Sequence, residues 1–228
     1  MFTGCGTALV TPFKSDLSVD EKALRALIER QITAGIDFLV PCGTTGESPT
    51  LEQAEQVRVC QITVEQANGR VPVLAGAGGY NTQHVIHMAH ELEKVGVNGL
   101  LSVTPYYNKP SQAGLFAHYS ALAEATWLPI ITYSVPGRTG MEIGVDTMAS
   151  LALKHPNIVA IKEAGGSIER FSQLRQALPA SVAILSGDDS MTLPALAVGA
   201  TGVISVASNL IPKQVVDMVR TFLGGRAK

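Results

Sequence analysis

Short apolar runs recur along the chain, and most are separated by stretches with helical periodicity. The runs contain mainly Val, Ile, Leu, Ala and Gly without polar alternation, which is typical of parallel strands buried on both faces. They predict strands at residues 5–10, 38–41, 71–76, 99–103, 129–134, 158–162, 182–186 and 202–206. The intervening patterns predict helices at residues 18–34, 50–68, 82–95, 111–126, 145–154, 167–178, 192–198 and 212–223.

Capping residues mark the ends of the first two predicted helices. Ser18 followed by Glu21 predicts a capping box at the start of the first helix, and Gly35 marks its end. Thr50 and Gln53 have the same spacing and predict the start of the second helix.

Strands and helices alternate eight times without a reversal of order. This alternation favours a closed (β/α)8 barrel, the TIM barrel, over an open doubly wound sheet. Linkers and low-complexity stretches are lacking, so we expect a single catalytic domain over residues 1–228.

Composition narrows the class of protein further. The 228 residues have a net charge of −2 and are 46% hydrophobic, enough for one well-filled core. Basic clusters that would bind nucleic acid or an anionic membrane are lacking, and no apolar stretch approaches the roughly 20 residues of a membrane span. The three cysteines are odd in number and lack metal-ligand spacing, so we expect reduced thiols in a cytoplasmic protein.

A lysine ends one of the buried strands. Lys162 follows the apolar run 158–161, where burial would lower the pKa of its amine and leave it neutral near pH 7. A neutral amine attacks carbonyl carbon, which is the chemistry of a Schiff-base enzyme. On this strand alone, a lysine whose stem packs while its amine reaches solvent is the simpler alternative.

The other strand ends contribute hydroxyl groups. In (β/α)8 barrels the reactive groups gather at the carboxyl ends of strands. Those ends supply Thr11, Thr44, Thr45, Tyr106, Tyr107 and Tyr133 around the single lysine. The pattern indicates amine catalysis with hydroxyl proton relays and no metal.

Two features that suggest a metal have simpler interpretations. His84, His87 and His90 recur on one predicted helix, but only the first two share a face and no third ligand accompanies them. Asp188 and Asp189 are adjacent and point apart, so we interpret them as a solvated or loop-capping pair.

Three motifs resemble those of a known family. Residues 43–47 (GTTGE), 133–140 (YSVPGRTG) and 161–164 (IKEA) are similar to the signatures of the pyruvate-dependent class I aldolases and lyases that include N-acetylneuraminate lyase. Within that superfamily the chain most resembles the dihydrodipicolinate synthase family, from residue 2 to about 223. Family members continue into extra C-terminal helices, so we expect a barrel without them.

The resemblance implies roles for the catalytic residues. Lys162 matches the lysine that condenses with the ketone of pyruvate, and Tyr133 matches the tyrosine that moves protons during imine formation. Thr44 and Tyr107 match the rest of a hydroxyl relay. In the family the tyrosine at the position of Tyr107 enters from a neighbouring subunit, which implies a homodimer or homotetramer.

The resemblance also implies a pyruvate-binding site. Thr45 and Gly46 lie in a turn whose N–H groups and hydroxyl match those that bind the pyruvate carboxylate, although such a turn alone is more often only a tight turn. Gly187 and Ile204 match positions that line the pyruvate pocket.

Arg138 separates the candidate substrates. Its planar guanidinium suits a carboxylate, and in the family the arginine here binds that of L-aspartate 4-semialdehyde. Sugar-acid lyases of the superfamily generally lack this arginine. The alternative is an arginine that only braces its own loop.

The implied reaction condenses pyruvate with L-aspartate 4-semialdehyde to give 4-hydroxy-tetrahydrodipicolinate, the first committed step of the diaminopimelate route to lysine. It requires no cofactor beyond the covalent imine of pyruvate with Lys162. Two alternatives stay open: another pyruvate-dependent aldolase, acting on a 2-keto-3-deoxy sugar acid or a hydroxy-oxoglutarate, and a catalytically silent barrel that binds a keto acid.

Overall fold

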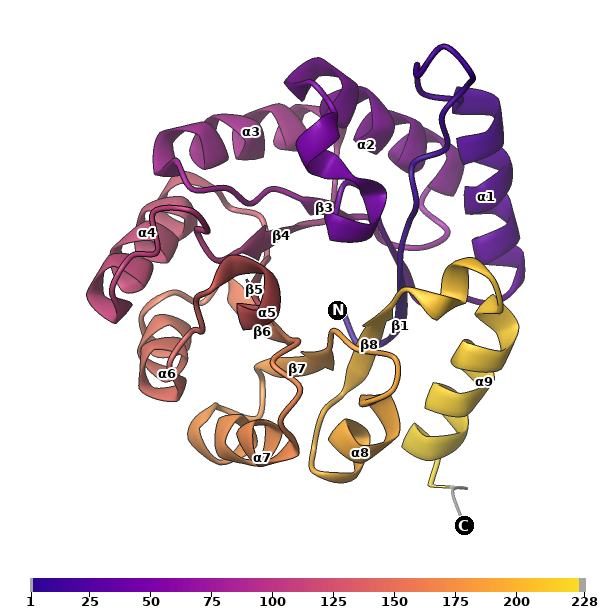
Figure 1. Cartoon of the computed structure of the whole chain (residues 1–228). Coiled ribbons are helices and arrows are strands. Elements are labelled where there is room, and N and C mark those ends of the chain that lie inside the picture. Colours follow the sequence, from indigo (N-terminus) through magenta and orange to yellow (C-terminus); the bar gives the residue numbers. More distant parts are fainter. Residues whose placement is uncertain (1, 226–228) are drawn as a thin grey trace.

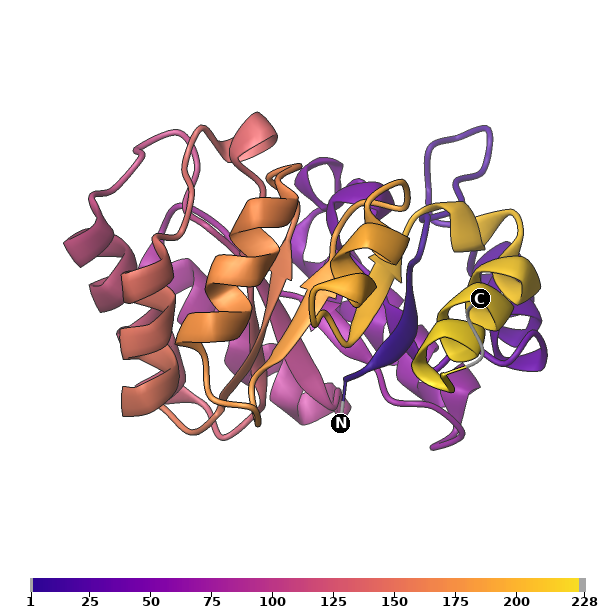
Figure 2. The ribbon, with the colours of Figure 1, turned by 90° about the horizontal axis from the view of Figure 1, so that it is seen from below.

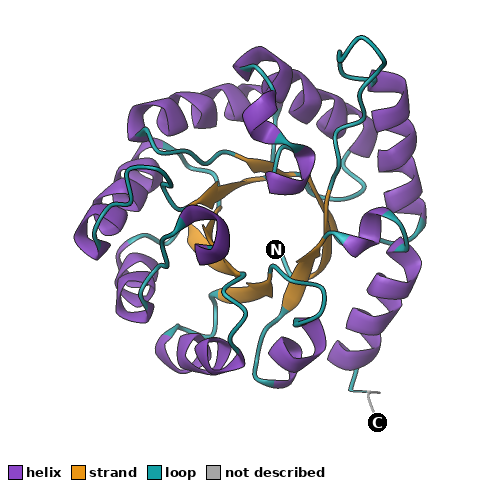
Figure 3. Ribbon diagram, viewed as in Figure 1, coloured by secondary structure: helices purple, strands orange, loops and turns teal. Residues whose placement is uncertain are grey.

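A closed ring of parallel strands forms the centre of the molecule. In this computed structural model, residues 2–225 are described, and within them eight strands are arranged in the order β2-β1-β8-β7-β6-β5-β4-β3 (Figure 1). A parallel bridge between Leu39 and Val73 joins the two ends of this order and closes the ring. Helices surround the strands on the outside (Figure 3). The predicted (β/α)8 barrel is confirmed.

The elements follow the predicted alternation. The strands are β1 Gly4–Ala8, β2 Phe38–Val40, β3 Leu74–Gly76, β4 Gly99–Val103, β5 Ile130–Ser134, β6 Ile158–Glu163, β7 Ala183–Ser186 and β8 Gly202–Ser205. The α-helices are α1 Glu21–Thr33, α2 Gln53–Ala67, α3 Thr82–Val95, α4 Gln112–Ala125, α5 Pro136–Thr139, α6 Val145–Lys154, α7 Ile168–Ala177, α8 Thr192–Ala197 and α9 Pro212–Leu223. Short 3₁₀ turns are η1 Thr44–Gly46, η2 Ser48–Thr50 and η3 Ala207–Asn209. Sequence patterns missed α5 and the 3₁₀ turns, because three or four residues carry no periodicity.

Both predicted capping boxes are wrong by two residues. The cap of α1 is Asp20, because the Ser18 hydroxyl instead donates a hydrogen bond to Asp16 at 2.6 Å. Thr50 ends η2, and Glu52 forms the capping box of α2. In both cases the hydroxyl group donates to a residue that precedes it, Asp16 for Ser18 and Glu47 for Thr50.

Apolar side chains fill the interior of the barrel. The buried cluster inside the ring consists of Phe2, Ala8, Phe38, Val40, Leu74, Leu101, Ile131, Tyr133, Val135, Ala160, Leu185 and Ile204. Successive side chains of a strand point to opposite faces, so Lys162, two residues after Ala160, also projects inward. The barrel therefore surrounds this lysine with hydrocarbon.

The strands all end at one face of the barrel. Figure 2 shows the chain from the side, with its N-terminus at the lower face and α5 at the upper face. The loops after β2, β5 and β7 also reach this upper face, which is where barrel enzymes place their reactive groups.

Within residues 2–225, none of the helices combines the length and the apolar character that crossing a membrane requires.

The closure of the barrel predicts the effect of one substitution. A Cβ atom added at Gly76 would lie 1.9 Å from the carbonyl oxygen of Cys42, at the contact between β2 and β3. We expect Gly76→Ala to lower the free energy of unfolding by about 1–3 kcal/mol or more, with a drop in Tm of about 2–4 °C per kcal/mol. Gly79→Ala is the control, because its nearest neighbour, Val85, lies at an ordinary 3.5 Å. Equal Tm values for the two variants, measured by calorimetry, would contradict this account of closure.

Candidate active site

Lys162 and Tyr133 lie side by side on neighbouring strands. They are partners in the register of β5 and β6. The Lys162 amine lies 4.1 Å from the centroid of the Tyr133 ring, and only 5% of the lysine is exposed. The structure therefore excludes the alternative in which this amine extends into solvent.

Burial changes the protonation of the lysine. Desolvation is the main cause that lowers the pKa of Lys162 from 10.5 to about 7, and the positive charge of Arg138 acts in the same direction. The negative charge of Asp189 opposes them. Near neutral pH a large fraction of this amine is therefore unprotonated and able to attack a carbonyl carbon.

Tyr133 keeps its proton at neutral pH. Burial raises the pKa of its phenol, while hydrogen bonding to the Thr44 side chain and the charge of Arg138 act in the opposite direction. A phenol held in this way can both donate and accept a hydrogen bond next to the Lys162 amine.

A cavity lies beside the carboxyl ends of these strands. Its volume is about 240 Å³, and its lining is formed by Thr44, Ser48, Pro49, Gly78, Val103, Tyr106, Val135, Arg138 and Thr139. A smaller cavity of about 40 Å³ shares Thr44, Ser48, Gly78 and Val103 with it and reaches Tyr133. Thr44 therefore lines both cavities, Tyr133 lines the smaller one and Arg138 lines the larger one.

The turn after β2 presents backbone N–H groups near this cavity. Thr44 and Thr45 begin the 3₁₀ turn η1, so their N–H groups have no acceptor within the turn. Gly46 is buried, and its carbonyl oxygen accepts a hydrogen bond of 2.7 Å from the Thr11 hydroxyl. The Gly46 N–H donates to the carbonyl oxygen of Gly43 at 3.0 Å, so within this turn the N–H groups of Thr44 and Thr45 are the ones that could bind an anion.

Gly187 lies against the lysine, and Ile204 belongs to the barrel interior. A Cβ atom at Gly187 would lie 2.9 Å from Cε of Lys162 and 2.7 Å from Cβ of Ala164, so this position must stay small for the lysine to keep its place. Ile204 is fully buried within the barrel interior.

Arg138 lies on α5, directly after β5. Its side chain is exposed and lines the larger cavity together with Thr44. Among residues 2–225 its guanidinium forms no hydrogen bond or ion pair, which argues against an arginine that only braces its loop. The guanidinium is therefore available to an anionic group in the cavity.

Tyr107 is not part of the cavity within one chain. It is 86% exposed, and its ring centroid lies 6.1 Å from that of Tyr80 on the surface. Tyr106, the residue before it, does line the cavity. The contribution of Tyr107 to a neighbouring subunit stays a prediction.

The two aspartates are loop caps, as we predicted. Asp188 accepts hydrogen bonds from the backbone and hydroxyl of Ser190, and Asp189 accepts from the N–H groups of Val206 and Ala207 at 3.0 and 2.9 Å. Within the described part of the chain, no group of three His, Cys, Asp or Glu side chains is arranged to hold a metal ion. No sequence pattern indicated that the charge of Asp189 also acts on the pKa of Lys162.

A buried amine beside a phenol, at the carboxyl ends of barrel strands, is the arrangement typical of (β/α)8 enzymes that form a Schiff base through a lysine. The chain belongs to the Dihydrodipicolinate synthetase family, whose sequence profile matches residues 1–228. A relative from Koribacter versatilis is 53% identical over 221 residues, 96% of this chain and 73% of the relative. One from Chloroherpeton thalassium is 51% identical over 217 residues, 95% of this chain and 72% of the relative. Both relatives are named 4-hydroxy-tetrahydrodipicolinate synthase.

Solved structures agree with this membership. The 4-hydroxy-tetrahydrodipicolinate synthase of Methylacidiphilum fumariolicum superposes with a TM-score of 0.98 at 51% identity, covering 99% of this chain and 75% of that one. Dihydrodipicolinate synthase from Aquifex aeolicus gives a TM-score of 0.97 at 47% identity, covering 99% and 76%. The resemblance read from the three motifs is confirmed.

The lowered pKa of Lys162 predicts how stability depends on pH. Below about pH 7 the amine is protonated in both states, so the folded chain bears the whole cost of a buried charge. Between about pH 7 and 10.5 only the unfolded chain keeps the proton, so stability gains as pH rises. We expect Lys162→Met to be more stable than wild type at about pH 6, by on the order of 4 kcal/mol, with a difference that shrinks toward pH 10.

Urea unfolding at several pH values measures this difference. The control is Lys154→Met, which removes a lysine whose side chain is 52% exposed and so carries no buried charge. A Lys162→Met effect that is constant from about pH 6 to 10 would show that the amine has an ordinary pKa.

Proposed function

We propose that this chain is a 4-hydroxy-tetrahydrodipicolinate synthase, a lyase that condenses pyruvate with L-aspartate 4-semialdehyde. The observation that carries the proposal is the buried Lys162 amine, held 4.1 Å from the Tyr133 ring with its pKa lowered to about 7. Relatives of this name at about half identity over most of the chain support the same reaction.

The first step forms a covalent imine. The neutral Lys162 amine attacks the ketone carbon of pyruvate, the ketone oxygen takes up a proton, and water then leaves as the C=N bond forms. Loss of a methyl proton converts this imine to the enamine. The lysine itself supplies the reactive group, so no external cofactor takes part.

Tyr133 moves the protons in these steps. Its phenol retains its proton at neutral pH and contacts both the lysine and Thr44, so it can deliver a proton to the ketone oxygen. Tyr107 of a neighbouring copy completes the relay toward solvent, which makes the active form a homodimer or homotetramer. One similar solved structure is described as a monomeric dihydrodipicolinate synthase variant, so assembly is not uniform among the relatives.

Two sites hold the two carboxylates. The N–H group and hydroxyl of Thr45, in the turn that Gly46 closes, bind the carboxylate of pyruvate, while Gly187 and Ile204 shape the pocket beside the lysine. Arg138 binds the carboxylate of L-aspartate 4-semialdehyde through its planar fork.

The second half of the reaction forms the ring. The enamine carbon attacks the aldehyde carbon, and a new carbon–carbon bond forms while the aldehyde oxygen gains a proton. The amine of the substrate then attacks the imine carbon and displaces Lys162, which releases 4-hydroxy-tetrahydrodipicolinate. This product begins the diaminopimelate route to lysine, and we place the enzyme in the cytoplasm with those small-molecule substrates.

The imine with Lys162 can be trapped. Pyruvate with borohydride should inactivate the enzyme irreversibly and add a reduced pyruvyl group to Lys162, identified by peptide mass spectrometry. Lys162→Met should show no adduct. Labelling at a different lysine, or retention of activity, would refute the Schiff-base mechanism.

Arg138 decides the second substrate. Arg138→Ala removes a charge-assisted pair, so we expect the KM for L-aspartate 4-semialdehyde to rise by a factor of tens to hundreds, from about 2–4 kcal/mol of lost binding. The KM for pyruvate and the yield of borohydride trapping should change little, because another site holds the pyruvate carboxylate. Wild-type cleavage of a 2-keto-3-deoxy acid without use of the semialdehyde would instead identify another aldolase.

A further inference from the structure

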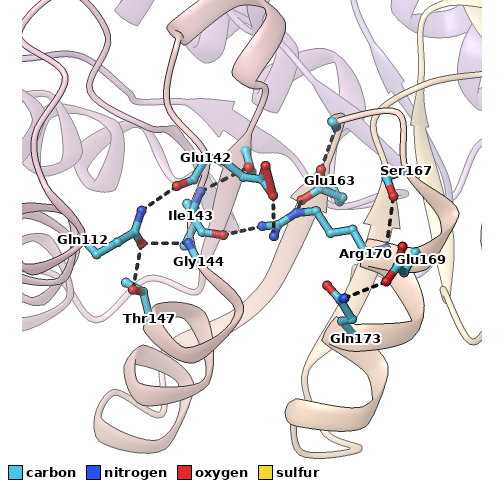
Figure 4. A network of polar contacts seen from close by, with 12 residues as sticks. Gln112, Glu142, Ile143, Gly144, Thr147, Glu163, Ser167, Glu169, Arg170 and Gln173 are labelled. Carbon is cyan, nitrogen blue, oxygen red and sulfur yellow. Dashed lines mark hydrogen bonds and ion pairs between the residues drawn. The ribbon is translucent and has the colours of Figure 1, made fainter.

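An ion pair lies directly behind the catalytic lysine, on the outer face of the same strand. Glu163 follows Lys162 on β6, so its side chain points away from the barrel interior and is fully buried. One carboxylate oxygen accepts a hydrogen bond of 2.7 Å from Nε of Arg170, and the other accepts one of 2.6 Å from the N–H of Gly165 (Figure 4). Both oxygens are occupied within the protein.

The other end of the same guanidinium reaches the segment behind Arg138. Arg170 forms an ion pair of 2.5 Å with Glu142 and donates a hydrogen bond to the carbonyl oxygen of Ile143. Residues 140–144 connect α5, which carries Arg138, to α6. A single buried side chain therefore joins the end of β6 to the loop that positions α5.

A second clamp holds this segment from the opposite side. The Gln112 amide, at the start of α4, donates to the carbonyl oxygen of Glu142 at 2.8 Å. The amide oxygen of Gln112 accepts from the N–H of Gly144 at 2.7 Å and from the hydroxyl of Thr147 at 2.8 Å (Figure 4). With α4 on one side and Arg170 on the other, the segment has a fixed position relative to β6.

We propose that Arg170 is a positioning residue for the second substrate: by joining Glu163 to residues 142–143, it fixes Arg138 relative to Lys162. The inference rests on the proposed function, because it concerns how the carboxylate-binding arginine is held at the right distance from the imine. Arg170 itself touches no substrate.

The chemistry of arginine suits this role. A guanidinium presents donors in several directions within one plane, so it can serve Glu163, Glu142 and Ile143 at once. A lysine ammonium can stay paired with Glu163 but lacks the fixed fork that reaches the second segment. Arg170→Lys thus keeps the buried charge compensated while it breaks the connection, and it avoids leaving Glu163 unpaired in the interior.

The test measures each substrate separately. In Arg170→Lys we expect the KM for L-aspartate 4-semialdehyde to rise roughly tenfold. A displacement of a binding group such as Arg138 by about 1 Å can cause a change of this size. The KM for pyruvate and the yield of borohydride trapping should stay within about twofold. The control is Arg58→Lys on α2. Arg58 donates two hydrogen bonds, of 2.8 and 2.7 Å, to the carboxylate of Glu21, and its replacement should leave both KM values unchanged.

A double-variant comparison separates positioning from general structural damage. If Arg170 acts through Arg138, then Arg170→Lys should add less than about twofold to the semialdehyde KM in an Arg138→Ala background. Effects of the two substitutions that multiply, or equal losses for both substrates, would overturn the inference.

A milder variant keeps the test decisive if Arg170→Lys does not fold. Glu142→Ala removes only the half-exposed end of the network, and we expect the semialdehyde KM to rise about threefold with no change for pyruvate. An unchanged semialdehyde KM in whichever variant folds overturns the inference, whereas the proposed function stands if wild type uses the semialdehyde and Arg138→Ala raises its KM. A wild type that does not convert the semialdehyde refutes the proposed function instead.

Discussion

The burial of one amine inside an apolar barrel is the constraint on which the site depends. An ammonium group in this interior needs a carboxylate partner, and the carboxylates of Asp189 and Glu163 are engaged by other groups. Asp189 accepts hydrogen bonds from the turn after β8, and Glu163 faces the other side of the sheet with Arg170. The amine of Lys162 therefore loses its proton at a much lower pH than an exposed lysine does, and its reactivity follows from that loss.

Because side chains alternate along β6, its two faces carry different groups. The inner face holds Lys162 beside Tyr133, where burial supplies reactivity. The outer face holds Glu163 in an ion network that reaches the loop behind Arg138. Neighbouring residues of a strand cannot move independently, so Lys162 and Glu163 keep a fixed relation on β6. The positioning of Arg138 that we propose depends on the same strand through the Glu163–Arg170 pair.

The sequence was sufficient to predict the barrel and its buried lysine, because both depend on local patterns. Unbroken apolar runs identify strands covered on both faces, and a lysine at the end of such a run enters the interior by alternation. Features that depend on competition between hydrogen-bond partners, or on contacts between residues far apart in the sequence, were not predictable. The Ser18 cap failed because Asp16 takes its hydroxyl, and α5 is too short to show periodicity.

Longer-range features of the site needed the folded chain. The Glu163–Arg170 pair joins a strand to the following helix and then to a segment more than twenty residues earlier, which no periodic pattern records. The relay role that we propose for Tyr107 requires a second copy of the chain, so neither the sequence pattern nor one folded chain tests it. Within one chain its ring lies on the surface beside Tyr80.

We infer that a large fraction of the Lys162 amine is unprotonated near neutral pH because the barrel excludes water from it. An NMR titration of that amine, with its signal assigned by its loss in Lys162→Arg, measures this directly. We expect a midpoint near pH 7 in the folded protein. A midpoint close to the ordinary lysine value of about 10.5 would contradict it.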